Sequence, residues 1–374
     1  MAVRQGANLL SAANEVLTLF RDALGSTDVQ NLEIKEFVHG NALHRGLAAK
    51  VDVGLGSRLM KVPKSSMVAS DDLMDARFSG AANDVAKIGL WLSEQRAAQA
   101  NHHVHNVSPE EQRLNAWIGA YPSLEELKTS GGALLIPDEA LKNWAGLPKV
   151  GTLKTWTEVV FKRLQDDVEL YNKNRGYRPK MTWEDAVWGR SMANTRDFSC
   201  RGAAVAPVAE YFNHGGRGSN VAWMCDKEGG ISFFAERPIK AGEELTIDYG
   251  KKSALDMVGM YGFNDPTRPE TWSASDCEKL QGAGLGFGKL RDGASPQERL
   301  VDELVANSCR DALKPEAGVS SDTHANAVAQ ASMGFLPVVA ASLDPQAMRA
   351  PPTSLWSKKV STQTRIRTQF SHFI

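Results

Sequence analysis

The order of the periodic segments constrains the fold of this chain more than any other sequence feature. Residues 31–70 show near-alternation of apolar side chains, which predicts two short antiparallel strands joined by a turn at Gly54 and Gly56. From about residue 71 to residue 195 apolar side chains recur at three- and four-residue spacing, which predicts helices. Strand patterns return at residue 203. This order predicts an α+β domain in which a large helical block is inserted between strands.

Individual segments add detail to this outline. The first 20 residues predict an amphipathic helix, and its inward side chains are Leu9, Leu10, Ala13, Val16, Leu17 and Phe20. The segment MTWEDAVWGRSMANTRDF predicts a helix with Thr182 as its N-cap. VAWMCD and ISFFAERP predict a hairpin across the turn KEGG. Further helices are expected around Cys277, from Ser295-Pro296 onward, and over residues 322–343.

Composition limits the classes of partner. The 43 basic and 44 acidic residues give a net charge of −1, so no excess charge draws the chain to nucleic acid or to an anionic membrane. No apolar run reaches the roughly 18 residues of a membrane-spanning helix, and Glu15 and Asp22 argue against an organelle transit peptide. We therefore expect a cytoplasmic monomer, with the nucleus and the plastid left open, whose partner is a protein or a small molecule.

The four cysteines do not suggest a metal site. Cys200, Cys225, Cys277 and Cys309 are widely spaced, without the short pair spacing of zinc ligands. We expect free thiols in a reducing compartment and no bound metal.

Two short motifs carry chemistry. In EYFNHGGRGSN, residues 210–220, Asn213 and His214 stand directly before a glycine-rich turn. In GEELTIDYG, residues 242–250, a turn leads into a strand that ends at Tyr249, where the following glycine allows another backbone to approach closely.

The order of motifs along the chain resembles that of the SET-domain protein methyltransferases. HRGLAAKVDVGLGSRLMKVP is followed by Thr195-Arg196, by FNH with Asn220 downstream, by ERPIKAGEELTIDYG and by MYGF. The resemblance covers roughly residues 30–265 and is to the branch with a long helical insertion, which includes the Rubisco large-subunit lysine methyltransferases and the actin-histidine methyltransferases. It implies a fold of small curved sheets with a pseudoknot, in which the FNH and DYG segments meet, and a short helical C-terminal region.

The resemblance also implies a cofactor and a set of site residues. The cofactor is S-adenosylmethionine, Tyr249 is the catalytic residue, and Glu210 and Tyr261 bind the substrate. The residues implied to bind the cofactor are Arg45, Gly46, Leu47, Arg196, Asn213 and His214. The chain departs from the family pattern at Ala254, where relatives commonly carry Asn, and at Glu210, where they often carry Asp.

The implied activity is S-adenosylmethionine-dependent methylation of a side-chain nitrogen in a non-histone protein, most simply a lysine. A histidine acceptor and a non-catalytic protein-binding module remain open. The implied organisation begins with an N-terminal helix and ends with a tail. In order, the parts are the helix at 1–30, the first SET part at 31–70, the helical insertion at 71–190, the second SET part at 191–265, a helical substrate-recognition region at 266–349 and the tail at 350–374.

Overall fold

The computed structural model describes most of the first 313 residues. The described ranges are 2–24, 29–39, 42–101, 108–130, 133–136, 141, 147–265, 267–268, 272–282 and 296–313. They belong to one compact unit, residues 1–313. The helix predicted over residues 322–343 and the predicted tail lie outside the described residues. Within the described ranges, no helix is long and apolar enough to cross a membrane.

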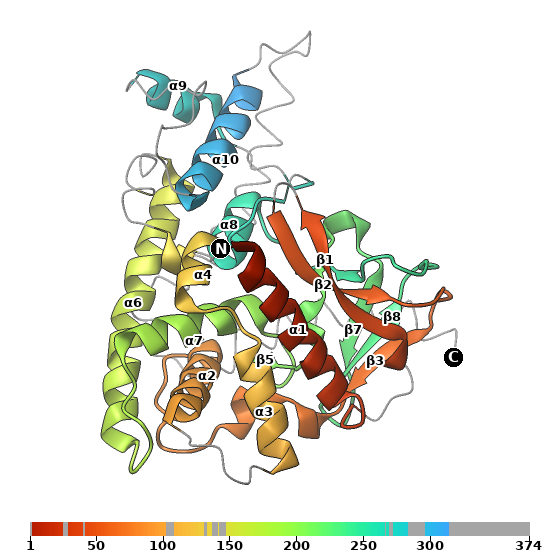
Figure 1. Cartoon of the computed structure of the whole chain (residues 1–374). Helices are drawn as coiled ribbons and strands as arrows, with labels where there is room; N and C mark the ends of the chain where they lie inside the picture. Colours follow the sequence, from red (N-terminus) through yellow and green to blue (C-terminus); the bar gives the residue numbers. More distant parts are fainter. Residues whose placement is uncertain are drawn as a thin grey trace. The chain divides into compact units, whose positions relative to one another are not determined.

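Short strands form several small sheets on one side of this unit (Figure 1). Strands β1 (Leu32–His39) and β2 (Ala42–Ala49) form an antiparallel pair. Strands β3 (Arg58–Val62), β8 (Ile231–Ala235) and β7 (Val221–Cys225) form an antiparallel sheet in that order. The β7–β8 register, from Val221 opposite Ala235 to Cys225 opposite Ile231, confirms the predicted hairpin across KEGG.

A second antiparallel pair encloses the helical insertion. Strand β4 (Val68–Ala69) pairs with β5 (Ala204–Val205), although more than 130 residues separate them. Among the described residues, the α-helices between these strands are α2 (Asp84–Asn101), α3 (Pro109–Gly119), α4 (Leu124–Ser130), α6 (Pro148–Asn174) and α7 (Trp183–Arg196). The insertion therefore leaves the sheet region and returns to it at the same place.

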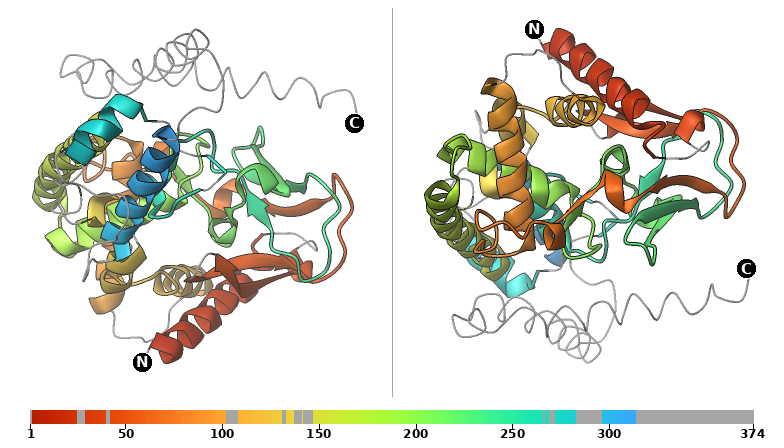
Figure 2. Two further views of the ribbon diagram at one scale, coloured as in Figure 1. Left: turned by 90° about the horizontal axis from the view of Figure 1, so that it is seen from above. Right: turned by 90° about the horizontal axis from the view of Figure 1, so that it is seen from below.

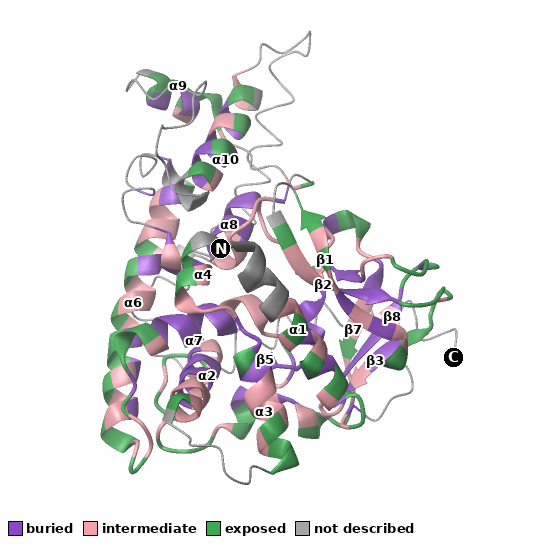
Figure 3. Ribbon diagram, in the orientation of Figure 1, coloured by how far each residue is buried: buried purple, intermediate pink, exposed green. Residues whose placement is uncertain are grey.

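Helices α2 and α7 form the centre of the insertion, and α7 is buried along most of its length (Figure 3). They approach so closely that a Cβ on Gly189 would lie 2.2 Å from the carbonyl oxygen of Gly89. Only glycine fits at this crossing. As predicted, Thr182 caps α7: its hydroxyl accepts from the N–H of Asp185, whose carboxylate accepts in turn from Thr182. This reciprocal capping box fixes where the helix begins.

The N-terminal helix α1 (Ala2–Phe20) runs beside β1 in both views of Figure 2. Ala13, Val16, Leu17 and Phe20 are buried in the main core, as predicted, whereas Leu9 and Leu10 are half-buried. The Asn14 side chain donates to the carbonyl of Ile34 and so ties the helix to the strand.

The C-terminal helices form a separate apolar cluster. Helices α8 (Ala254–Tyr261), α9 (Ala274–Gly282) and α10 (Pro296–Ala312) contribute to it together with the start of α6. Val258 and Val305 are among its fully buried members. These helices therefore pack against the first turns of α6 as well as against each other.

The prediction of two strands joined at Gly54 and Gly56 is wrong. Strand β3 pairs with β8, and between the end of β2 and the turn only Val53 makes a strand-like bridge, to Ile239. Leu55 is 69% exposed. Alternating apolar residues specify which side chains can share a face, but they do not specify the partner strand, which here comes from about 170 residues further along the chain.

The prediction of free thiols also fails. Cys200 pairs with Cys225, and Cys277 pairs with Cys309, with Cα–Cα distances of 5.9 Å and 5.4 Å. The first pair lies where the segment before β5 meets the end of β7, and the second joins α9 to α10. Sequence separations of 25 and 32 residues gave no indication of these contacts, which depend on tertiary packing.

Candidate functional site

The two motifs meet through a parallel pair of very short strands. Strand β6 (Asn213–His214) pairs with β9 (Thr246–Ile247), with Asn213 opposite Thr246. Asn220 holds the pair together: its amide donates to the carbonyl of Glu244 (2.8 Å) and its side-chain oxygen accepts from the N–H of Thr246 (2.8 Å). Asn220 is buried, and these bonds satisfy both ends of its amide.

Asn213 points toward β2. Its Nδ2 donates to the backbone oxygen of Arg45 (3.1 Å) and to Oε1 of Glu244 (2.8 Å). A Cβ on Gly46 would lie 2.5 Å from that carboxylate oxygen and 2.7 Å from Nδ2. Glu244 also pairs with His39 at 2.9 Å. A glycine at position 46 is therefore what allows the Asn213 amide to reach the strand.

Arg45 and Leu47 contribute to this place through their backbones. The guanidinium of Arg45 turns away and donates to the carbonyls of Leu9 in α1 (3.1 Å) and Ala120 after α3 (3.0 Å). The side chain of Leu47 is fully buried in the core, while its carbonyl accepts from the N–H of Leu245. The Arg45 side chain is thus a link to the helices rather than a group facing Asn213.

His214 is fixed from both ring nitrogens. Its Nδ1 accepts from the N–H of Tyr249 (3.1 Å), so its proton is on Nε2, which donates to Oδ2 of Asp265 (3.0 Å). Burial disfavours the Asp265 carboxylate, but hydrogen bonds from His214 and Thr267 outweigh it and lower the pKa of Asp265. Sequence reasoning missed Asp265; the signal was an acid two residues after the MYGF motif.

Tyr249 lies in a cluster of aromatic rings. Its ring centroid is 4.7 Å from that of Tyr261 and 5.1 Å from that of His214, and Phe263 borders all three rings. The Tyr249 hydroxyl donates to the carbonyl of Phe212 (3.0 Å). Burial raises the pKa of Tyr249 to about 12, although the positive charge of Arg196 opposes the shift. The hydroxyl is therefore a neutral hydrogen-bond donor at physiological pH.

A lysine of the chain itself borders this cluster. The ammonium of Lys252 donates to the backbone oxygen of Tyr249 and lies 5.5 Å from the centroid of the Tyr261 ring. Burial raises the pKa of Tyr261 above its ordinary range. The aromatic surface around Tyr249 and Tyr261 thus already accommodates an ammonium group.

Arg196 and Glu210 lie together beside the insertion. Arg196 is the last residue of α7; its Nη1 donates to Oγ1 of Thr195 (2.7 Å) and its Nε is 3.9 Å from Oε2 of Glu210. The Glu210 side chain is 1% exposed and accepts from Nε1 of Trp117 (2.8 Å) and from the hydroxyl of Tyr121 (2.5 Å). Burial raises the pKa of Glu210 to about 7.

The structure therefore groups the predicted site residues into neighbouring clusters. Gly46 and the backbone of Arg45 meet Asn213, and His214 meets Tyr249, whose ring in turn contacts that of Tyr261. Glu210, expected to meet a substrate, has its two carboxylate oxygens turned toward the insertion. Arg196 pairs with Glu210, and its positive charge also acts on the pKa of Tyr249.

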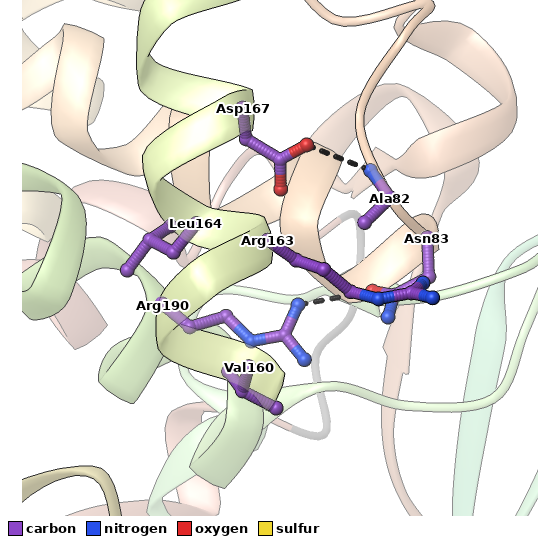
Figure 4. Close-up of a pocket in the computed structure, with 7 residues that line it drawn as sticks. All are labelled: Ala82, Asn83, Val160, Arg163, Leu164, Asp167 and Arg190. Atoms are coloured by element: carbon purple, nitrogen blue, oxygen red, sulfur yellow. Dashed lines mark hydrogen bonds between the residues drawn. The ribbon is translucent and has the colours of Figure 1, made fainter. Parts of the chain in front are cut away.

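A small cavity of about 20 Å³ lies elsewhere, inside the insertion (Figure 4). Asp167 and Arg190 line it; Arg190 donates to Oδ1 of Asn83, and Asp167 accepts from the N–H of Ala82. Burial raises the pKa of Asp167 to about 6 and lowers that of Arg190 to about 10. None of its lining residues is a predicted site residue, and its volume suits about one water molecule.

Comparison with known proteins agrees with this geometry. Residues 44–250 match the family model of the SET domain. The match spans more than half of the chain, and the protein belongs to the SET-domain family. No curated protein matches it.

Solved structures show the same fold. Rubisco LSMT bound to sinefungin and monomethyllysine aligns with a TM-score of 0.51 and 19% identity, over 68% of this chain and 56% of that one. The SET domain of LSMT bound to lysine and AdoHcy aligns with a TM-score of 0.52 and 19% identity, over 69% of this chain and 58% of that one. This chain thus spans less than two thirds of the length of either. The predicted α+β SET fold with a helical insertion is confirmed.

Proposed function

We propose that this protein is an S-adenosylmethionine-dependent protein methyltransferase that methylates a side-chain nitrogen, most simply of lysine, in a non-histone protein. The observation that carries the proposal is the β6–β9 pair in a SET fold. It brings His214 beside Tyr249, whose ring contacts Tyr261, while Asn213 reaches the backbone of Arg45 and the carboxylate of Glu244. Two neighbours in that fold carry lysine or monomethyllysine together with a cofactor analogue or product, which favours a lysine acceptor over histidine.

The residues at this place fit the cofactor. Asn213 and Glu244 offer an amide and a carboxylate beside the narrow strand passage at Gly46, where a side chain would intrude. Arg196 offers a guanidinium suited to the cofactor's carboxylate. The buried hydroxyl of Tyr211 has no hydrogen-bond partner among the described residues, so it can still form a hydrogen bond with a bound ligand. We propose that Arg45, Leu47 and His214 contribute through backbone and positioning.

The cofactor supplies a methyl group on a positively charged sulfur, and the chain must supply orientation and a dry channel. An amine attacks only as the free base, so a lysine must lose its proton on entering. We propose that the Tyr249 hydroxyl orients the reacting groups, and that Tyr261 lines the acceptor channel with its ring. The neutral hydroxyl and the carbonyls around it can accept and donate hydrogen bonds without adding a competing charge.

The C-terminal helices complete the proposal. We propose that the region from residue 266 recognises the protein substrate, since α9 and α10, which follow the MYGF segment, pack against each other and α10 also packs against α8. The cytoplasmic location and the monomeric state stay predictions from the sequence.

Calorimetric titration with S-adenosylmethionine and with S-adenosylhomocysteine tests the cofactor assignment. We expect both to bind, and Asn213→Ala to weaken both. Mass spectrometry of a lysate incubated with the enzyme and labelled cofactor then identifies the acceptor residue. A labelled histidine would replace the lysine assignment, and absence of binding by both compounds would favour the protein-binding module.

A further inference from the structure

The carboxylate of Glu210 is surrounded by groups from separate parts of the fold. Trp117 lies in α3 and Tyr121 follows it, and both donate to the carboxylate from the helical insertion. Arg196 approaches from the end of α7 at 3.9 Å. Glu210 itself belongs to the short helical turn η5 (Ala209–Tyr211), two residues before β6. The cluster thus joins the insertion to the strand that carries Asn213.

Tyr121 acts on Arg196 in two ways. Its hydroxyl donates to Glu210, and the Arg196 guanidinium lies 5.1 Å from the centroid of its ring. Trp117 packs edge-on against Tyr121, with ring centroids 6.3 Å apart, and is itself 3% exposed. These contacts leave the carboxylate and the guanidinium little freedom to rotate.

The cost of burying this carboxylate makes a purely passive role a poor explanation. A buried carboxylate is costly unless hydrogen bonds and opposite charges offset its lost hydration. Here two neutral donors hold its orientation and two cations, Arg196 and Arg45, lie in its electrostatic range. The hydrogen bonds from Trp117 and Tyr121 fix the orientation of the Glu210 carboxylate, and the negative charge of that carboxylate attracts the Arg196 guanidinium.

We infer that Trp117 and Tyr121 are positioning residues for Arg196, acting through Glu210, so that the helical insertion helps to build the cofactor site. This inference rests on the proposed function, because Arg196 is proposed there to meet the cofactor. It replaces the expected role of Glu210 as a direct substrate ligand.

Tyr121→Phe is the sharpest test, because it removes one hydroxyl and keeps the ring beneath Arg196. The matched control is Tyr171→Phe, since the Tyr171 hydroxyl also donates to a buried carboxylate, that of Glu94 (2.8 Å), in the same insertion. Loss of a hydrogen bond to a charged group predicts that Tyr121→Phe raises the dissociation constant of S-adenosylhomocysteine about tenfold. We expect Tyr171→Phe to bind like the wild type, even though both variants lower the melting temperature.

The pH dependence of cofactor-product binding distinguishes a positioning role of Tyr121 from a general effect of the substitution on protein stability. The charged and titratable groups facing Glu210 are Arg196, Arg45, Tyr121 and Tyr211. The pKa of Glu210 is about 7, so wild-type affinity should fall as the pH drops below that value. Removing the Tyr121 hydroxyl, which favours the ionised form, should move this midpoint to higher pH. In Tyr171→Phe the midpoint should stay in place.

The outcomes distinguish this inference from the proposed function. If the wild type binds no S-adenosylhomocysteine, the cofactor assignment itself fails. If the wild type binds it, and Tyr121→Phe shows the same affinity and the same pH midpoint, the positioning role is overturned alone. Trp117→Phe provides an independent second variant, and we expect it to weaken binding in the same direction.

Discussion

Gly46→Ala tests the geometry of the site most directly. The added Cβ would lie 2.5 Å from Oε1 of Glu244 and 2.7 Å from Nδ2 of Asn213, the two atoms that form a 2.8 Å hydrogen bond. Both atoms belong to side chains, so they would move apart while the strand stays in place. The substitution therefore breaks a specific contact rather than the fold.

The size of the effect on binding follows from the proposed contact between Asn213 and the charged cofactor. A hydrogen bond to a charged group contributes about 1.5–3 kcal/mol, so an Asn213 amide displaced from that contact should weaken cofactor binding roughly 10- to 100-fold. Crowding in the strand costs about 1–3 kcal/mol of unfolding free energy, partly offset because alanine restricts the unfolded chain more than glycine does.

Calorimetry with S-adenosylhomocysteine measures the predicted loss. Gly54→Ala is the control, because a Cβ there meets only the hydroxyl of Ser57 at 3.6 Å, an ordinary contact. Circular dichroism of both variants establishes that they fold. Equal affinity of Gly46→Ala and the wild type would refute the reasoning that places the cofactor at Asn213.

Four further predictions concern other groups. Tyr249→Phe should cut turnover at least about tenfold, or about 1.4 kcal/mol of barrier, with cofactor affinity nearly unchanged; steady-state kinetics with an unchanged rate would remove Tyr249 from the mechanism. Asp265→Ala leaves the buried Nε2–H of His214 without its acceptor and should lower the unfolding free energy by about 1–3 kcal/mol in a urea titration; an unchanged midpoint and slope would contradict this. Thr182→Ala removes the cap of α7 and should cost about 1 kcal/mol in the same assay, and a fully stable variant would show that the cap is dispensable. The pKa of Glu210 is raised from 4.5 to about 7, so the folded state binds more protons than the unfolded state between these pH values, and its stability should fall by about 3 kcal/mol as the pH rises through them. In Glu210→Gln the melting temperature should depend less on pH over this range than in the wild type. The same pH dependence in both proteins would contradict the raised pKa of Glu210.

Local patterns in the sequence were sufficient for much of the fold. Thr182 and the acidic residues after it predicted the start of α7, and the turn KEGG between two apolar runs predicted the β7–β8 hairpin. Both features depend on residues close together in the chain, where spacing and turn chemistry decide the outcome. The order of the motifs likewise indicates the SET family without any information on tertiary contacts.

Tertiary structure decided the contacts between distant segments. Strand β3 pairs with β8 rather than with its sequence neighbour, and β6 pairs with β9, although the β7–β8 hairpin lies between them in the chain. No periodicity specifies such partners, because alternation fixes a face and leaves the pairing strand open. Packing of the whole domain selects it.

The same division holds within the site. The order of the motifs in the sequence implied that Asn213, His214 and Tyr249 belong to one site, and the structure brings His214 to Tyr249. Only the fold turned Glu210 toward Trp117 and Tyr121, which lie 93 and 89 residues earlier, and placed Asp265 against His214. A buried carboxylate takes its partners from whichever elements pack around it, so its role is set by burial and charge in three dimensions.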